Sequence, residues 1–234
     1  MKLPTLTPAL LVRRYKRFLA DVELVDGRKV TVYCPNTGAM TGCIDFGARV
    51  WLSRSENPKR KYAFTLELIE TKNGLICIHS VRANKVVMEG LENGVIKELS
   101  KYRQISSEVR YGEGSRADLV LSREDDSSVI IEVKAVTLYL GQGVGAFPDA
   151  TSVRALKHTV ELTNAINSST RSLIIFCVFH SGINEVTIAK EIDPAYFIAL
   201  ESALRAGLEI QAWSVDISIS ALTLEKRIPF NLGS

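Results

Sequence analysis

The stretch SRADLVLSREDDSSVIIEVKAV, residues 115–136, places three charged side chains inside two otherwise apolar runs. The two runs predict strands, and the polar turn that joins them is short enough for antiparallel pairing. Side chains alternate faces along a strand, so Glu132 and Lys134 share one side of the second strand. With Asp118 on the partner strand, two carboxylates are expected to converge near one lysine.

The expected cluster has a chemical consequence. Two carboxylates in a partly desolvated place oppose each other's ionisation unless a cation lies between them. Mg²⁺ or Mn²⁺ would remove that conflict, because such cations bind a few carboxylates together with water and phosphate oxygens. Asp118, Glu132 and Lys134 are therefore candidate catalytic residues for phosphodiester cleavage, with both acids as metal ligands and the lysine near the attacking water. The alternative is an exposed ion pair between Glu132 and Lys134, which contributes only about 0.2–1 kcal/mol.

Two further acids precede these strands in the sequence. Glu108 could project from a neighbouring strand beside Asp118 and act as a further catalytic acid. Glu98, near the end of the preceding predicted helix, could be a further metal ligand. Each could also be an ordinary exposed acid, so the sequence leaves the choice open.

A basic helix is predicted directly after the acidic strands. The segment FPDA at 147–150 leads into a helix at 152–166, with Ser152 as its N-cap. The helix carries three candidate DNA contacts, which are Arg154, Lys157 and His158. Their spacing lets them face a phosphate backbone together. For His158 a structural or solvent-facing role stays equally open.

The chain divides into two predicted domains. In the first domain, short strands closed by turns are predicted at 18–25, 29–34, 49–53, 62–70 and 75–81. This pattern is typical of a small closed barrel, and an OB-fold is the candidate. An apolar residue at every fourth position predicts a helix at 84–99. The domain border is placed just before that helix, giving domains 1–83 and 84–234. The second is expected to be mixed α/β, with strands at 105–111, 117–122, 129–138, 173–179, 208–215 and 219–225 and a helix starting at Asp193-Pro194.

Charge is unevenly distributed, although the net charge is only +3. Residues 1–110 hold 19 Lys and Arg against 11 Asp and Glu, whereas the remainder holds 10 against 15. The segments RRYKRF at 13–18 and PKRKY at 58–62 mix cations with aromatic residues, a pattern that suits phosphate contact and base stacking. The candidate DNA contacts of the barrel are Arg13, Arg14, Lys16, Arg17, Lys59, Arg60 and Lys61. A solvated charged edge is the alternative interpretation.

Two remaining features concern a loop and the compartment. In CPNTGAMTG at 34–42, the residues Asn36, Thr37 and Gly38 could cradle an anion or form an ordinary turn. The four cysteines form no C-x-x-C pair, so buried free thiols are expected. The longest apolar run, at 173–179, is too short to cross a membrane, and we expect a cytoplasmic protein without membrane contact.

Several motifs together resemble one known family. These are RRYKRFLADV, CPNTGAMTGC, NPKRKY, SEVRYG, SRAD, IEVKAVTL, FPDA and the Lys157-His158 pair, which are spread over essentially the whole chain. They are similar to the sugar fermentation stimulation protein A family. The resemblance implies an OB-fold followed by a PD-(D/E)XK nuclease-like domain, whose core Asp118, Glu132 and Lys134 would match. Ala155 stands where relatives commonly have glycine, a change that a helix tolerates.

Two functions compete at this point. The resemblance implies sequence-nonspecific DNA binding and a regulatory role in sugar (maltose) metabolism. The residue chemistry favours a Mg²⁺- or Mn²⁺-dependent DNA endonuclease. The alternative is a DNA-binding accessory regulator of maltose metabolism genes in which the acidic site does no catalysis, since a fold alone does not establish an activity.

Overall fold

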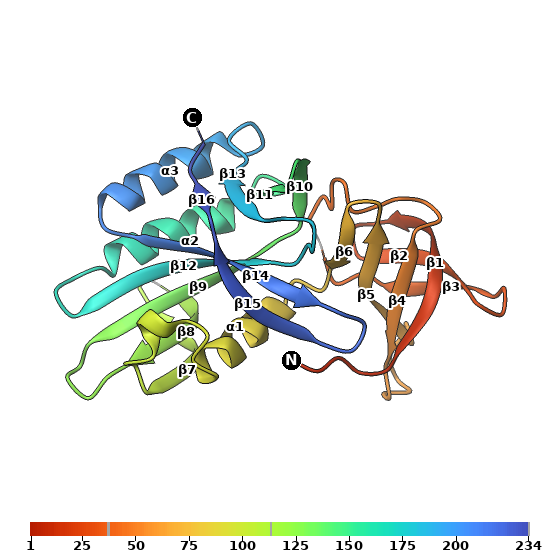
Figure 1. Cartoon of the computed structure of the whole chain (residues 1–234), viewed down its shortest axis with the longest axis horizontal. Coiled ribbons are helices and arrows are strands. Elements are labelled where there is room, and N and C mark those ends of the chain that lie inside the picture. The colour runs from red at the N-terminus through yellow and green to blue at the C-terminus, as the bar shows by residue number, and fades with distance from the viewer. Residues whose placement is uncertain (37, 113, 234) are drawn as a thin grey trace.

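Alternating apolar residues close the N-terminal part of the chain into a barrel (Figure 1). The computed structural model describes residues 1–36, 38–112 and 114–233. The barrel strands are β1 (Leu6–Tyr15), β2 (Leu19–Leu24), β3 (Lys29–Tyr33), β4 (Arg49–Arg54), β5 (Phe64–Thr71) and β6 (Gly74–Cys77). They pair in the order β3-β2-β1-β4-β5-β6, and a β3–β5 pairing closes the barrel. Val22, Val50 and Leu52 face its core, which confirms the expected OB-type barrel.

Strand β1 was not predicted. Its first residues pair with β4 alone, because pairing with β2 begins only at Ala9. Pro8 therefore lies on a stretch with one strand neighbour, where the missing N–H is tolerated. The cations at the other end of β1 hid its alternation, in which Ala9 and Leu11 point into the core.

A six-stranded sheet with helices on both faces forms the second domain (Figure 1). Its strands are β7 (Gln104–Tyr111), β8 (Ser115–Ser122), β9 (Ser128–Val136), β12 (Thr170–Val178), β14 (Glu209–Ile217) and β15 (Leu222–Ile228), in the order β15-β14-β12-β9-β8-β7. Helix α1 (Arg82–Glu92) covers one face, and α2 (Val153–Asn164) and α3 (Pro194–Arg205) cover the other. This mixed α/β architecture confirms the predicted fold class.

The helix boundaries follow local capping chemistry. Ser152 accepts a hydrogen bond from the Ala155 N–H at 3.1 Å, and Asp193 accepts one from the Tyr196 N–H at 3.0 Å, so α2 and α3 begin where the sequence predicted. The helix predicted at 84–99 is shorter. It ends at Glu92, since Gly94 takes a φ of +69° that a helix cannot continue, and a separate 3₁₀ turn, η1, spans Lys97–Leu99.

Four short strands escaped the sequence analysis. These are β10 (Leu138–Gly141), β11 (Val144–Phe147), β13 (Glu185–Ile188) and β16 (Phe230–Asn231), which form a small sheet in the order β10-β11-β13-β16. Each has at most four residues, too few for an alternation pattern to stand out. The β10–β11 hairpin lies between the large sheet and the barrel in Figure 1.

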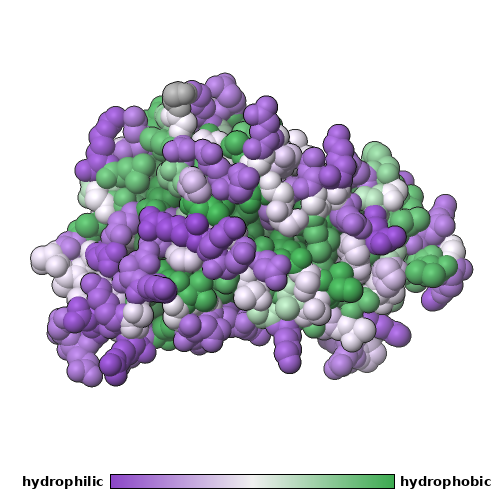
Figure 2. Space-filling view, viewed as in Figure 1, coloured by the Kyte–Doolittle hydropathy of each residue, from purple (hydrophilic) through white to green (hydrophobic). Residues whose placement is uncertain are grey.

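Backbone hydrogen bonds join the two domains. The Cys77 N–H donates to the Phe179 carbonyl at 3.0 Å, and the Ser181 N–H donates to the Leu75 carbonyl at 3.0 Å. Residues 179–181 thus pair alongside β6 at the edge of the barrel sheet. On the face seen in Figure 2, polar residues dominate the outer surface, and apolar residues show near the middle of the molecule, between the barrel and the α/β domain. None of the helices within the described ranges is long and apolar enough to cross a membrane.

Candidate active site

Strands β8 and β9 separate at the position of the predicted acids. They pair from Ser122 and Ser128 to Leu119 and Ile131, and beyond that point β9 continues beside β12 while β8 continues beside β7. Asp118 fills the opening. Its Oδ2 accepts the backbone N–H of Val133 at 2.8 Å, and its Oδ1 accepts the side-chain amide of Asn84 on α1 at 2.7 Å. The Asp118 carboxylate is therefore fixed between β9 and α1.

Glu132 is the buried centre of the cluster, with 3% of its surface exposed. Its Oε1 accepts a hydrogen bond from Lys134 Nζ at 2.6 Å and lies 2.6 Å from His158 Nδ1 on α2. Its Oε2 is buried and has no hydrogen-bond partner among the residues that the structure describes. Two neighbours thus hold one oxygen of this carboxylate, and the lone pairs of the other oxygen are unused.

The electrostatics of the two acids differ. Burial raises the pKa of Asp118, and the charge of Glu132 raises it further. Burial also acts to raise the pKa of Glu132, but the hydrogen bond with His158 and the charge and hydrogen bond of Lys134 outweigh it, so that pKa is held below its usual value. One acid is therefore held as a carboxylate, while the ionisation of its neighbour is opposed. A cation beside both would relieve the opposition.

A divalent cation fits this donor set. Across the described residues, no three His, Cys, Asp or Glu side chains gather closely enough to form a metal site made of protein alone. Mg²⁺ does not need such a cage, because it keeps several waters and binds through one or two carboxylates. Asp118 and the unpartnered Oε2 of Glu132 are the groups that could hold it.

The pocket around the acids is lined by both domains and has a volume of about 570 Å³. Glu108 is the upstream acid that reaches it. This residue lies on β7 between the pairs Ser107–Leu119 and Val109–Ala117, and thus opposite Asp118. It is exposed and has a φ of +56°, an unusual backbone conformation for a glutamate. The charged residues lining the pocket are Arg17, Glu108, Asp118, Glu132, Lys134, Asp149 and Arg154.

Glu98 does not reach the acids, and the expectation that it joins the metal site is corrected. Its Oε1 accepts a hydrogen bond from Gln211 at 3.0 Å and lies 3.3 Å from Arg227 Nη1. It lines a different surface hollow, together with Arg171 and Glu209. Glu98 lies away from the other acids because α1 ends early, at Glu92, and Glu98 falls on the separate turn η1.

Helix α2 brings one of its three predicted DNA contacts to the pocket. Arg154 is exposed and lines it. Lys157 is exposed and pairs with Glu161 at 3.5 Å. His158 is buried against Glu132, so its expected phosphate contact is corrected: the side chain faces the protein interior and positions the carboxylate. The sequence could not separate these roles, because the helix face that meets the sheet was unknown.

The barrel cations also have different roles. Arg14 donates to the carbonyls of Arg17, Asn36 and Gly38 at 2.6, 2.9 and 2.8 Å, so its guanidinium holds the loop at 34–42. Arg13 pairs with Asp21 at 2.7 Å and remains largely exposed. Lys16, Arg17 and the three cations at 59–61 are exposed in turns and loops of the barrel. Of this barrel set, Arg17 lines the pocket of the acids.

The loop at 34–42 packs against Asp149, an acid whose role the sequence does not predict. The Met40 N–H donates to Asp149 Oδ2 at 3.1 Å. Gly38 approaches the same carboxylate so closely that a Cβ there would lie under 3.0 Å from both of its oxygens. Asn36 Oδ1 accepts the Gly38 N–H at 2.8 Å, as in an ordinary turn, and Thr37 lies outside the described residues. The anion at this loop is thus the protein's own Asp149.

This close approach predicts the effect of one methyl group. The substitution Gly38→Ala should lower the free energy of unfolding by about 0.5–1.5 kcal/mol, because the new Cβ displaces the Asp149 carboxylate from its hydrogen bond with the Met40 N–H. Urea denaturation of the variant and the wild type measures the difference. In an Asp149→Ala background the obstacle is gone, so the same substitution should cost much less. An equal cost in both backgrounds would show that the carboxylate is not responsible.

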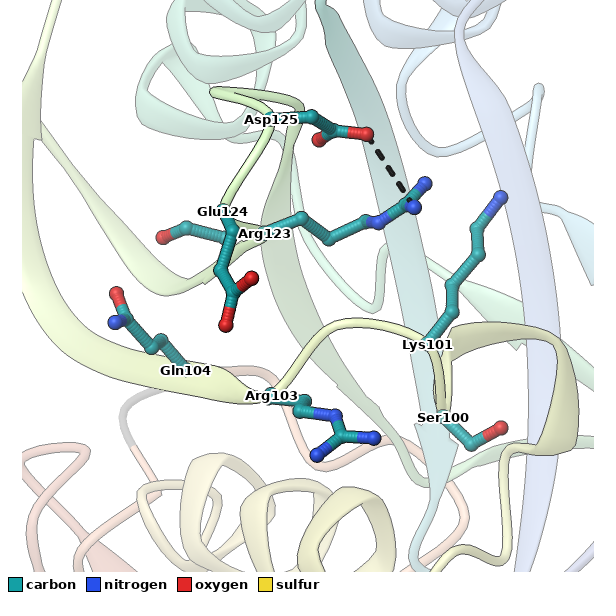
Figure 3. Close-up of a pocket in the computed structure, with 8 residues that line it drawn as sticks. Ser100, Lys101, Arg103, Gln104, Arg123, Glu124 and Asp125 are labelled. Atoms are coloured by element: carbon teal, nitrogen blue, oxygen red, sulfur yellow. Dashed lines mark ion pairs between the residues drawn. The ribbon is translucent and has the colours of Figure 1, made fainter.

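A second hollow, of about 640 Å³, lies at the far end of β8 (Figure 3). Its charged residues are Lys101, Arg103, Arg123, Glu124 and Asp125. Figure 3 shows Arg123 reaching toward Asp125, with which it pairs at 3.3 Å, while Lys101 and Arg103 extend in different directions. The hollow contains neither Asp118 nor Glu132, so it is not the candidate active site.

An OB-type barrel joined to a mixed α/β domain, with an Asp-Glu-Lys pocket at the junction, defines the class of this two-domain protein. Residues 12–78 match the model of the SfsA N-terminal OB domain, and residues 81–221 match the model of the sugar fermentation stimulation protein RE domain. The chain belongs to the sugar fermentation stimulation protein family, as its motifs suggested.

Relatives match along nearly the whole chain. A sugar fermentation stimulation protein homolog of Saccharophagus degradans is 48% identical over 95% of this chain and 96% of its own. A homolog from Shewanella loihica is 47% identical, over 98% and 99%. The Pyrococcus furiosus SfsA structure, solved in complex with Ca²⁺, has a TM-score of 0.87 and 24% identity, covering 99% of this chain and 98% of that one. That protein shares the fold of both domains.

Proposed function

We propose that this chain is a sequence-nonspecific DNA-binding protein whose pocket cleaves phosphodiester bonds with Mg²⁺ or Mn²⁺. The observation that carries the proposal is the meeting of Asp118, Glu132 and Lys134 in a pocket between two domains, with Glu132 Oε2 buried and unpartnered. The Ca²⁺ complex of the Pyrococcus furiosus protein supports a divalent cation. The four cysteines are buried free thiols, which fit our placement of the protein in the cytoplasm.

Asp118 and Glu132 would hold the cation. When bound, a divalent ion lowers the pKa of a coordinated water and offsets the charge that develops on the phosphoryl group. Lys134 hydrogen-bonds Glu132 through one N–H of its ammonium and has two more donors for a phosphate oxygen or the attacking water. His158 supports Glu132 from the helix side through Oε1, so this contact does not use Oε2. Glu108, opposite Asp118, is a further acid of the pocket.

The experiment that tests this function is plasmid cleavage by the purified chain. Supercoiled plasmid should be nicked or linearised with Mg²⁺ or Mn²⁺, and excess EDTA should stop the reaction, because the acids then lose the cation. Calorimetric titration with Mn²⁺ should show binding of the metal without DNA. A silent titration together with an intact plasmid would reject the enzyme.

The second candidate is the DNA-binding accessory regulator of maltose metabolism genes. One observation favours it: Lys134, His158, Asn84 and the Val133 N–H together satisfy three of the four oxygens of Asp118 and Glu132. The two acids therefore already have most of the hydrogen-bond partners that a purely structural role requires. Salt-dependent DNA binding without any cleavage would select this function.

Neutralisation of phosphates by the barrel should be visible in the salt dependence of DNA binding. Replacing Lys59, Arg60 and Lys61 by glutamine should reduce the slope of log K against log salt concentration by about one for each phosphate that is no longer neutralised. Fluorescence anisotropy over a salt series measures the slope. A control in which Arg123 and Arg205 become glutamine, far from the barrel, should keep the wild-type slope. If the two variants behave alike, the barrel is not the surface that binds DNA.

His158 should affect the rate of DNA cleavage by positioning Glu132. We expect His158→Ala to slow cleavage by about 10–100-fold, since the partner of a metal-ligating group fixes its orientation. His158→Gln retains a hydrogen-bond donor and should recover part of the rate. DNA affinity should be unchanged in both, because the side chain is buried. A loss of affinity in place of rate would point to a phosphate contact after all.

A further inference from the structure

We infer that the pocket takes single-stranded DNA, whose bases rest on exposed apolar side chains at its rim. The inference rests on the proposed function and concerns the form of DNA that the site accepts. Three elements each place an apolar residue at or beside the pocket lining. Val81 at the start of α1 lines the pocket and is 71% exposed; Phe18 and Val153, 45% and 80% exposed, are the chain neighbours of the lining residues Arg17 and Arg154.

On two of these elements a cation and an apolar residue are neighbours in the chain. Arg17 is followed by Phe18 in the turn between β1 and β2, and Val153 is followed by Arg154 at the start of α2. A duplex presents phosphates outward and keeps its bases stacked inside. A single strand presents both, and proteins bind it with cations along the backbone and aromatic side chains on which the bases stack. Phe18 supplies the ring here, and Val81 and Val153 offer apolar contact beside it. The rim therefore offers groups for phosphates and for unstacked bases together.

The size of the pocket fits a single strand better than a duplex. The barrel wall is held against the α/β domain by the Met40–Asp149 hydrogen bond and by Cys43, whose Sγ donates to the Thr137 carbonyl at 3.5 Å. A volume of about 570 Å³ lies in the range of pockets that hold a small organic ligand. Such a space accepts one or two nucleotides of an extended strand but no turn of duplex. The substrate class is single-stranded DNA, including unpaired ends and gaps.

The test compares binding of a labelled oligonucleotide of about 20 nucleotides with binding of its own duplex, by fluorescence anisotropy at fixed salt. The full-length wild type should bind the single strand more tightly. Phe18→Ala should weaken single-strand binding by about tenfold and duplex binding by less than about twofold, because only bases stack on the ring. Phe46→Ala is the matched control: it removes another exposed barrel aromatic, 75% exposed, that has no pocket-lining residue beside it in the chain.

A second pair of variants covers the helix side of the rim. Val153→Ser should weaken single-strand binding, whereas Val160→Ser, an exposed valine further along α2, should not. Both positions are on the surface, so folding should be retained and is checked by thermal unfolding. Equal affinity for strand and duplex, or equal effects of Phe18→Ala and Phe46→Ala, would overturn the inference and leave the proposed function standing. Absence of binding to either form would overturn both.

Discussion

Replacing Glu132 by glutamine should reduce metal-dependent DNA cleavage by at least about a hundredfold and leave DNA affinity unchanged or slightly increased. The amide has nearly the same shape, and its oxygen can still accept the hydrogen bond from Lys134. It carries no negative charge, however, and its nitrogen cannot ligate a cation where Oε2 now lies unpartnered. A rate loss in this range is typical when a group that acts on the reacting atoms is removed.

The measurement is the initial rate of plasmid nicking at saturating Mn²⁺, with Mn²⁺ affinity followed by calorimetry. Glu98→Gln is the matched control, because that acid lies in a separate hollow with Gln211 and Arg227. It should cleave like the wild type. Wild-type cleavage by Glu132→Gln would show that the activity resides elsewhere or comes from a contaminating nuclease.

Replacing Glu67 by alanine should lower the free energy of unfolding by about 3–5 kcal/mol, the usual cost of removing one partner of a buried ion pair. Glu67, on β5, is 1% exposed. Arg82, the first residue of α1, donates to it twice, at 2.6 and 2.7 Å. Ser53 donates at 2.7 Å, and His79 Nδ1 lies at 2.8 Å. Without the carboxylate, Arg82 would keep a half-buried charge with no counter-ion among these partners.

Glu209→Ala provides the control for Glu67→Ala. Glu209 also accepts two hydrogen bonds from one arginine, Arg171, at 2.7 Å for both. Those side chains are 39% and 37% exposed, and a pair so open to water contributes about 0–1 kcal/mol. Chemical denaturation of both variants compares the two sites. Similar losses would mean that burial does not set the strength of the Glu67 cluster.

The same cluster should make the fold sensitive to acid. Burial acts to raise the pKa of Glu67, but hydrogen bonds from His79, Arg82 and Ser53 outweigh it and hold the pKa at about 2, against 4.5 for an ordinary glutamate. Because the folded-state pKa is the lower one, the stabilisation is complete above about pH 4.5 and is lost as the pH falls toward 2. In Glu67→Gln this part of the acid dependence should be absent.

The sequence was informative where one local pattern decides the structure. Alternation along residues 115–136 was enough to place Glu132 and Lys134 on one side of a strand, and the structure shows them hydrogen-bonded. Cap chemistry likewise located the starts of α2 and α3 at Ser152 and Asp193. These features depend only on neighbours in the chain, so they can be predicted without the fold.

Other features depend on contacts between distant segments. The burial of His158 against Glu132 follows from which face of α2 meets the sheet, and this is set by packing. The role of Asp149 depends on a barrel loop more than a hundred residues earlier in the chain, at Met40. Glu98 was misplaced because a single glycine, Gly94, ends α1 early and redirects the chain.

The way residues 179–181 extend β6 means that the barrel is not a self-sufficient module. In the described part of the chain, the outward N–H and C=O of Leu75 and the N–H of Cys77 bond across the domain junction, to residues 179 and 181. A fragment cut after the barrel would expose those groups as an open strand edge, which readily recruits other chains. Such a fragment should be prone to aggregation and poorly soluble. Point substitutions in the intact chain therefore test the barrel better than truncation does.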